Sequence, residues 1–152
     1  MILKVFTDGG SKGNPGPSSI GGVGYLYPAK SEGRSGVDGK KAFEFKKAIG
    51  IATNNDAEYQ ALINALEIIN PKSQNPNKIQ ISSFQKIKQI QFFSDSRLMV
   101  NQAKGLFKIK NGRIKEYVFI IRGLEQEINL PITYSYVPRE QNVEADLLVN
   151  SV

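Results

Sequence analysis

The chain contains no cysteine and no histidine. The absence of cysteine excludes disulfide bonds and thiolate metal sites within the chain, and it is compatible with a reducing cytosol. The absence of histidine excludes a Ser-His-Asp triad and the imidazole that most often serves as a general acid or base. Any catalysis by this chain must therefore use carboxylates, hydroxyls, amides, lysine or arginine.

Long apolar runs are also missing. No run approaches the roughly 18 residues that a membrane-spanning helix needs, and the apolar start from Met1 to Phe6 is too short for a signal-peptide core. We therefore expect a cytoplasmic protein with no membrane partner. A length of 152 residues suits one domain, so we predict a single domain over residues 1–152, and we expect a monomer.

Basic residues exceed acidic ones. Lysine and arginine number 20 against 14 for aspartate and glutamate, which gives a formal net charge of +6. This excess favours a polyanionic partner such as nucleic acid, although a solvated, lysine-rich surface would give the same count.

Hydrophobic patterning predicts an α/β protein whose first three strands form an antiparallel meander. A turn-rich loop over residues 11–17 and a polar connection over 30–41 separate these strands. Residues 78–88 are ambiguous, because Ile79 and Ile81 alternate as in a strand whereas Phe84 and Ile87 fit a helical turn; we interpret them as a family-variable insertion. The predicted strands are 2–8, 20–27, 42–51, 89–94 and 132–137. The predicted helices are 55–70, 96–103, 115–128 and 143–152.

A short echo links two of the predicted strands. Phe6-Thr7-Asp8 and Phe93-Ser94-Asp95 share the order aromatic, hydroxyl, acid, and each is expected to close a strand. The hairpin and helix between them indicate a crossover, so the two strands should run parallel. If the strands are neighbours, Asp8 and Asp95 emerge side by side at the carboxyl ends, where open α/β sheets bind ligands.

Four acids stand out in the sequence, and each has an ordinary structural explanation. Asp8 could stabilise a turn through an Asx hydrogen bond. Glu58 has the spacing of a capping box with Asn55. Asp95 could cap the following helix, and Asp146 could be a first-turn acid that the helix dipole stabilises.

Considered together, the four acids favour a metal site. All are predicted at strand ends or in first helical turns, and four adjacent carboxylates would repel one another without cations. Carboxylates without nitrogen or sulfur ligands suit hard ions such as Mg²⁺ or Mn²⁺. Two such ions about 3.5–4 Å apart would flank a phosphate. The pattern indicates phosphodiester chemistry without a small-molecule cofactor.

Four sequence blocks resemble type 1 ribonuclease H. The segment 7–17, Thr-Asp-Gly-Gly-Ser-Lys-Gly-Asn-Pro-Gly-Pro, is similar to the opening of that family, and 53–62 contains its Asn-Asn-x-x-Glu pattern. The Ala-Glu-Tyr-x-Ala-Leu form of this second block is typical of the bacterial and archaeal branch. Segments 95–102 and 137–146 match the third and fourth blocks. The blocks follow the family's order and span nearly the whole chain.

The resemblance implies a ribonuclease H-like fold: a mixed five-stranded sheet with strands 1–3 antiparallel, strands 4 and 5 parallel to strand 1, and helices on both faces. It implies endonucleolytic cleavage of the RNA strand of RNA–DNA hybrids, giving 5′-phosphate and 3′-hydroxyl ends. It also implies two Mg²⁺ or Mn²⁺ ions held by Asp8, Glu58, Asp95 and Asp146. Asp8 would bridge both ions, and Glu58 would lie near the 2′-hydroxyl beside the scissile phosphate.

The resemblance also implies a substrate-binding set. Asn14, Asn54 and Asn55 are expected to meet RNA hydroxyls and bases, since amides both donate to and accept from a 2′-hydroxyl. Thr53 and Asn101 are expected in a DNA-phosphate pocket. The remaining expected substrate contacts are Gly9, Gly10, Ser11, Lys12, Ser96, Phe107, Lys108 and Arg139.

Two departures from many relatives are visible. The loop before the last acid, residues 138–142, carries no histidine, and Arg139 or Glu140 would take part of its role. The chain also lacks the tryptophans that some relatives use in a basic handle. The stretch 104–115 holds five cations and no acid, and its lysines and Phe107 could bind the nucleic-acid backbone instead. A solvated helix–loop face is the alternative for this stretch.

Three other functions remain open at this stage. They are a catalytically silent module that binds hybrids or double-stranded RNA, a related nuclease for double- or single-stranded RNA, and an exonuclease or integrase-type enzyme of the same fold. The Asn-Asn segment and the glycine-rich opening favour the hybrid nuclease over all three.

Overall fold

The computed structural model describes residues 1–28 and 39–152, so most of the connection predicted over 30–41 lies outside the described residues. Five strands form one mixed sheet in the order β3-β2-β1-β4-β5. The pairs β1–β2 and β2–β3 are antiparallel, whereas β1–β4 and β4–β5 are parallel. The strands are β1 (Ile2–Ser11), β2 (Gly16–Tyr27), β3 (Lys40–Ala52), β4 (Gln89–Ser94) and β5 (Ile132–Tyr136).

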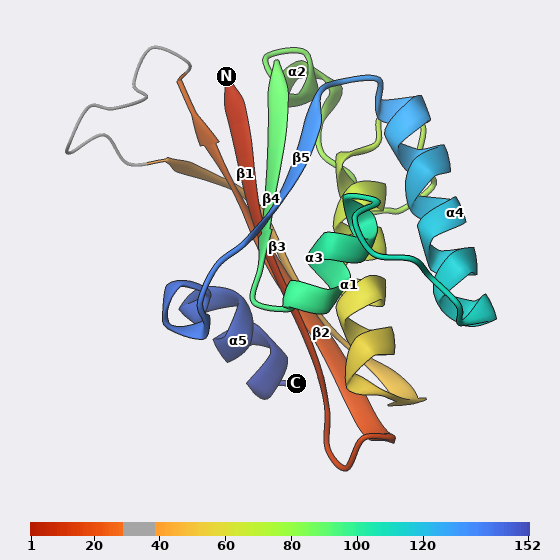
Figure 1. Ribbon diagram of the computed structural model, residues 1–152. Helices are drawn as coiled ribbons and strands as arrows, with labels where there is room; N and C mark the ends of the chain where they lie inside the picture. Colours follow the sequence, from red (N-terminus) through yellow and green to blue (C-terminus); the bar gives the residue numbers. More distant parts are fainter. Residues whose placement is uncertain (29–38) are drawn as a thin grey trace.

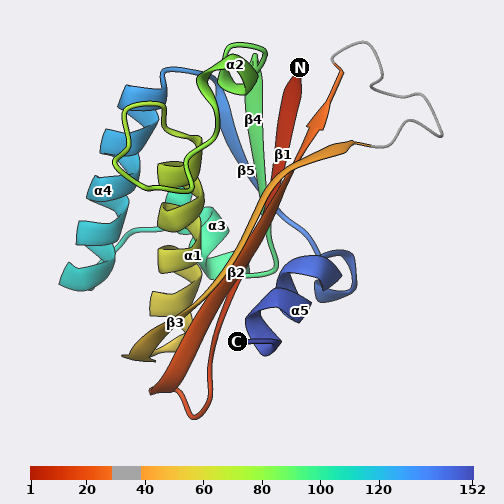
Figure 2. The same cartoon turned by 180° about the vertical axis from the view of Figure 1, so that it is seen from behind.

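Helices cover both faces of this sheet. One face carries α1, α3 and α4, and the other carries α5 (Figures 1 and 2). The helices are α1 (Asn54–Ile69), α2 (Ile81–Phe84), α3 (Arg97–Ala103), α4 (Gly112–Ile128) and α5 (Val143–Asn150), and a 3₁₀ turn, η2 (Arg139–Gln141), precedes α5. The arrangement confirms the expected mixed five-stranded sheet with helices on both faces.

The main core lies between the sheet and the pair α1 and α4. Leu3 and Val5 of β1 and Ile90 of β4 are fully buried there, and they meet Leu62 of α1 and Ile121 of α4. Burial of a large aliphatic side chain contributes about 1.5–3 kcal/mol, so this layer fixes how α1 sits on the strands. None of the helices in the described ranges is both long and apolar enough to cross a bilayer.

The strand that carries Asp8 is longer than the sequence suggests. The prediction that this strand ends at Asp8 is wrong, because β1 continues to Ser11 as a hairpin with β2. The parallel pairing with β4 does end early, at Phe6 opposite Phe93. Asp8 and Asp95 therefore both follow the last parallel pair, although only Asp95 follows the end of its strand.

Helix starts also differ in detail from the expectations. Helix α1 begins one residue earlier, with Thr53 as N-cap, and its capping box pairs Thr53 with Asp56, so Glu58 and Asn55 form no such box. Ser96, not Asp95, caps α3. Helix α4 begins at Gly112 because the Asn111 side chain accepts hydrogen bonds from the next turn. Glu58 and Asp95 are thus left without a capping role.

The ambiguous stretch before β4 forms no strand. It contains only the single helical turn α2, while Ile79 and Ile87 on either side are buried in the main core. The two isoleucines hold the ends of the segment against the core. Their spacing therefore reflects these two attachment points and not the period of a strand or a helix.

Candidate active site

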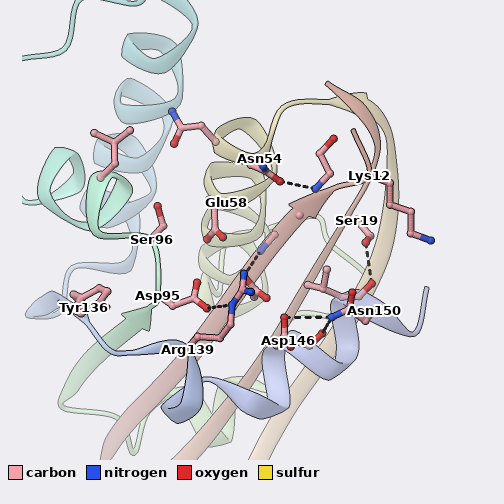
Figure 3. A pocket seen from close by; sticks show the side chains of 17 residues that line it. Lys12, Ser19, Asn54, Glu58, Asp95, Ser96, Tyr136, Arg139, Asp146 and Asn150 are labelled. Atoms are coloured by element: carbon pink, nitrogen blue, oxygen red, sulfur yellow. Dashed lines mark hydrogen bonds and ion pairs between the residues drawn. The ribbon is translucent and has the colours of Figure 1, made fainter. Parts of the chain in front are cut away.

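The four predicted acids come from four different elements. Asp8 lies on β1, Glu58 on α1, Asp95 directly after β4, and Asp146 on α5. All four line one cavity of about 660 Å³. Figure 3 shows Glu58, Asp95 and Asp146 turned toward this space from three sides. The fold therefore gathers residues that are up to 138 positions apart in sequence.

A glycine on β1 allows α1 to bring Glu58 to Asp8. A Cβ atom on Gly9 would lie 2.3 Å from the carbonyl carbon of Ala57, inside the backbone of α1. No side chain fits there, because backbone atoms cannot move aside as a flexible side chain can. Helix α1 therefore crosses β1 in direct contact, and Glu58 stands beside Asp8.

A second glycine, on β2, allows α5 to pack directly against the sheet. Gly21 on β2 pairs with Asp8 in the sheet register, and a Cβ atom there would lie 2.9 Å from the Cβ of Leu148 and 3.0 Å from the backbone nitrogen of Val149. The close packing of α5 on this strand places Asp146 over the same part of the sheet as Asp8.

Three of the acids form a tight group. Asp8, Glu58 and Asp95 each offer a carboxylate oxygen, and these atoms lie within 4.8 Å of one another. Asp146 lies outside that group, and its carboxylate accepts a hydrogen bond from Asn150 Nδ2 at 3.3 Å. Arg139 reaches Asp95, with Nε 3.8 Å from Oδ2, while its own side chain stays 79% exposed (Figure 3).

The grouping raises the proton affinity of the buried acids. Burial raises the pKa of Asp8 to about 7, with hydrogen bonding to Glu58 opposing the shift and the charges of Asp95 and Asp146 adding to it. Burial and the neighbouring Asp8 hold the pKa of Glu58 well above its usual value. Burial also raises the pKa of Asp95, although Arg139 opposes this shift. Each carboxylate is thus costly to ionise without a cation.

This arrangement fits a divalent metal ion. The donors are all carboxylate oxygens, which hard cations such as Mg²⁺ and Mn²⁺ prefer. The Oδ2 atom of Asp95 is buried and accepts no hydrogen bond from the described residues. A cation bound between these oxygens would supply the missing partner and remove the mutual repulsion.

Asparagine side chains join the β1–β2 turn to the start of α1. The Oδ1 atom of Asn14 accepts from the backbone N–H of Asn54 at 2.8 Å, and Oδ1 of Asn54 accepts from the N–H of Ser11 at 2.8 Å. These bonds occupy the carbonyl oxygens of both amides and leave their NH₂ groups to meet a ligand.

The other expected substrate contacts divide into two groups. Eight line the active-site cavity with the acids: Gly9, Gly10, Ser11, Lys12, Asn54, Asn55, Ser96 and Arg139. Five do not line it: Asn14, Thr53, Asn101, Phe107 and Lys108. The Thr53 hydroxyl is engaged in the capping box of α1, whereas Phe107 and Lys108 are exposed in the connection from α3 to α4. Their contacts with substrate remain predictions.

Sequence reasoning missed several residues of this cavity. Asn150 follows Asp146 by one helical turn, a spacing that could have indicated it. Asn142 does not line this cavity but is buried, and its Nδ2 donates to the backbone oxygen of Thr7 at 2.9 Å, which ties the start of α5 to β1. Nothing in the local sequence marks the rest, which depend on strand register and helix packing. The lining residues outside the prediction are Ser19, Leu98, Tyr136, Val149 and Asn150.

The family now follows from sequence as well as geometry. The RNase H family model matches residues 2–150, and the chain belongs to the RNase H family. The sheet order and the helices on both faces are the RNase H-like fold.

Named relatives agree with this assignment. The chain is 32% identical over 150 residues to the bifunctional protein Rv2228c of Mycobacterium tuberculosis, covering 99% of this chain and 35% of that protein. It is 32% identical over 148 residues to ribonuclease HI of Halobacterium salinarum, covering 97% and 62% of the two chains. The solved structure of LC11-RNase H1 in complex with an RNA/DNA hybrid superposes with a TM-score of 0.76 at 31% identity, covering 99% of this chain and 95% of that one. The chain thus spans about a third of the first of these relatives.

Proposed function

We propose that this chain is an endoribonuclease that cleaves the RNA strand of RNA–DNA hybrids with two divalent metal ions, Mg²⁺ or Mn²⁺. The observation that carries the proposal is the convergence of Asp8, Glu58 and Asp95 within 4.8 Å, beside Asp146, in a member of the RNase H family. The hybrid bound to the similar LC11-RNase H1 supports the choice of substrate. In this proposal residues 1–152 act as one domain and as a cytoplasmic monomer.

The four acids would hold the ions. Bound divalent ions at such a site supply an activated water and charge stabilisation at the leaving oxygen, which yields 5′-phosphate and 3′-hydroxyl ends. The chain's own residues position the RNA. The NH₂ group of Asn54 and the side chain of Asn55 border the cavity and can hydrogen-bond a 2′-hydroxyl, the group that distinguishes RNA from DNA.

Arg139 takes a positioning role in this scheme. Its guanidinium is paired with Asp95 across 3.8 Å but is largely exposed, so it can exchange that carboxylate for a phosphate oxygen when a cation occupies the acids. This exchange places a permanent positive charge beside the cleaved strand in a chain that has no histidine.

The basic stretch 104–115 is held next to the start of α1. Arg113 Nε lies 2.9 Å from Oδ1 of the buried Asp56, in the first turn of α1. Lys108 and Lys110 precede this ion pair and are exposed. We propose that they contact the backbone of the hybrid, since lysine–phosphate contacts add affinity without base preference.

The double change Lys108→Glu with Lys110→Glu should weaken hybrid binding and lower the slope of log K against log salt by about one to two. Fluorescence anisotropy over a range of salt concentrations measures both effects. The matched control is Lys86→Glu with Lys88→Glu, which makes the same charge change before β4, at the opposite end of that strand from Asp95. Equal slopes for the two double variants would show that the stretch does not touch the backbone.

A cleavage assay separates this function from its rivals. End-labelled RNA–DNA hybrid, double-stranded RNA, single-stranded RNA and double-stranded DNA are each incubated with Mg²⁺, Mn²⁺ or EDTA. Metal-dependent cuts confined to the RNA strand of the hybrid are the expected result. Binding without cleavage would indicate a silent module, and cleavage of another substrate would keep the metal site but reject the hybrid.

A further inference from the structure

A second, smaller cavity lies between the sheet and the start of α5. It measures about 180 Å³, well below the roughly 300–1,000 Å³ of pockets that hold drug-sized ligands. A space of this size accepts one ring system rather than a peptide segment. Its lining residues are Phe6, Val23, Tyr25, Tyr27, Gln141, Asn142, Val143 and Glu144.

Aromatic rings dominate the sheet side of this cavity, which we call the aromatic cavity. Phe6 of β1 stacks on Phe93 of β4 with ring centroids 4.9 Å apart. The Lys4 ammonium lies 4.9 Å from the ring centre of Tyr27, and Lys41 lies 5.9 Å from that of Tyr25. A flat aromatic ligand gains stacking energy on such side chains, and every nucleobase has a π-face.

The polar groups of the aromatic cavity suit an uncharged ligand that donates hydrogen bonds. Glu144 accepts from the Tyr25 hydroxyl at 2.5 Å and pairs with Lys41 at 3.0 Å. These partners use only part of the carboxylate, which has about four lone-pair sites. The Lys41 charge is shared with Glu44 at 3.4 Å, so little net charge is left to hold a phosphate.

An unsatisfied acceptor gives a second indication of a ligand. Asn142 lines the aromatic cavity and is only 1% exposed, yet its Oδ1 accepts no hydrogen bond from the described residues. An unpaired buried carbonyl oxygen is costly. This oxygen is enclosed, so a donor on a bound molecule would reach and stabilise it only once the Asn142 side chain turns toward the cavity. Amino-bearing bases provide such donors, and a carboxylate accepts readily from the amino group of cytosine.

The aromatic cavity is separate from the candidate active-site cavity but lies on the same two elements, β1 and α5. Phe6 lies two residues before Asp8 on the same strand, and Asn142 donates to the Thr7 carbonyl between them. Helix α5 borders both cavities, with Glu144 on one and Asp146 on the other. A nucleic acid in the active site could therefore extend a single-stranded end into the aromatic cavity.

We propose that the aromatic cavity binds one unpaired base that carries an amino group, supplied by a single-stranded end of the nucleic acid at the active site. The part of this proposal that assigns the base to a nucleic-acid end rests on the proposed function, whereas the binding of a base in the aromatic cavity does not. Tyr25 and Tyr27 provide the stacking surface, and Glu144 accepts from the amino group.

The first experiment tests base binding alone, in metal-free buffer. Amide chemical shifts are followed while the dinucleotides CpC, GpG and UpU are titrated into the protein. CpC or GpG should shift the signals of Tyr25, Gln141 and Glu144, and UpU should bind about fivefold more weakly because it carries no amino group. Tyr25→Leu should abolish the shifts, and Tyr25→Phe should keep stacking but reduce the preference. No shift at these residues would overturn the proposal.

The second experiment tests the source of the base. Binding of a blunt hybrid is compared with that of hybrids carrying a two-nucleotide overhang at either strand end, in an Asp8→Asn background that prevents cleavage. An overhang of cytosine should raise affinity about tenfold, and Tyr25→Leu should remove the gain without weakening blunt-hybrid binding. Phe119→Leu, at an 80% exposed ring on α4, is the matched control.

The outcomes of the two experiments are distinguishable. Dinucleotide binding with no overhang effect would overturn the assignment to a nucleic-acid end and leave a free nucleotide as the occupant. Failure of the blunt hybrid to bind would instead count against the proposed function, while the dinucleotide titration would still decide whether the aromatic cavity captures a base.

Discussion

Asp8→Asn should lower hybrid cleavage by at least about a thousandfold, while hybrid binding stays equal or becomes tighter. Asp8 belongs to the tight group of three carboxylates and is only 4% exposed. The substitution keeps the size of the side chain but removes a charge and an anionic metal ligand. Metal ions contribute several kcal/mol to such reactions, and each 1.36 kcal/mol corresponds to a factor of ten. Hybrid binding is not weakened, because the substitution removes the negative charge of Asp8, which would repel a phosphate of the hybrid.

Single-turnover cleavage and anisotropy with the same labelled hybrid measure the two effects of Asp8→Asn separately. Glu116→Gln provides the control, since it neutralises an exposed carboxylate on α4 far from the four acids in sequence. It should leave both cleavage and binding unchanged. Normal turnover by Asp8→Asn would show that the metal assignment is wrong.

The proximity of two candidate active-site acids, Asp8 and Asp95, could be predicted from sequence alone. The repeated aromatic-hydroxyl-acid trio predicted neighbouring parallel strands, and the register of β1 with β4 ends at Phe6 and Phe93, before Asp8 and Asp95. The prediction succeeded because strand periodicity and crossover connections follow from local pattern. The family match over residues 2–150 agrees with the four blocks that carried the resemblance.

The close contacts that assemble the site could not be predicted in the same way. The predicted strand stops before Gly9, yet Gly9 lies within β1 and is required there because the backbone of α1 leaves no room for a Cβ atom. The ion pair between Asp56 and Arg113 joins residues 57 positions apart, and no local pattern specifies it. Both contacts depend on how the helices pack on the assembled sheet, and the distances between packed elements cannot be read from a single sequence.

A second large effect concerns stability without metal. The pKa of Asp8 rises from 3.8 to about 7 on folding, and those of Glu58 and Asp95 are also raised. Between about pH 4 and pH 7 the folded protein therefore binds more protons at these acids than the unfolded chain does. Stability must then fall as pH rises through this window. Lowered pKa values, such as those of Asp56 and Glu144, act at more acidic pH and do not oppose the trend.

We expect the metal-free protein to melt at a lower temperature at about pH 8 than at about pH 5, and Mg²⁺ to restore much of the loss at pH 8 only. A shift of one pKa unit corresponds to 1.36 kcal/mol, so Asp8 alone accounts for roughly 2–4 kcal/mol, or about 5–10 °C for a domain of this size. Thermal denaturation followed by circular dichroism, with EDTA or Mg²⁺ at matched ionic strength, measures both trends.

The same variant that loses cleavage should gain metal-free stability. Asp8→Asn cannot ionise, so its melting temperature in EDTA at about pH 8 should exceed that of the unmodified chain, and Mg²⁺ should raise it less. Glu116→Gln should follow the unmodified chain in every buffer. Two results would contradict the idea that the carboxylates repel one another in the folded protein. One is a metal-free melting temperature that rises from pH 5 to pH 8. The other is a Mg²⁺-induced rise in melting temperature that is as large for Asp8→Asn as for the unmodified chain. The acids would then not form a cation site, because the repulsion between carboxylates in such a site lowers the stability of the metal-free protein and bound metal restores it.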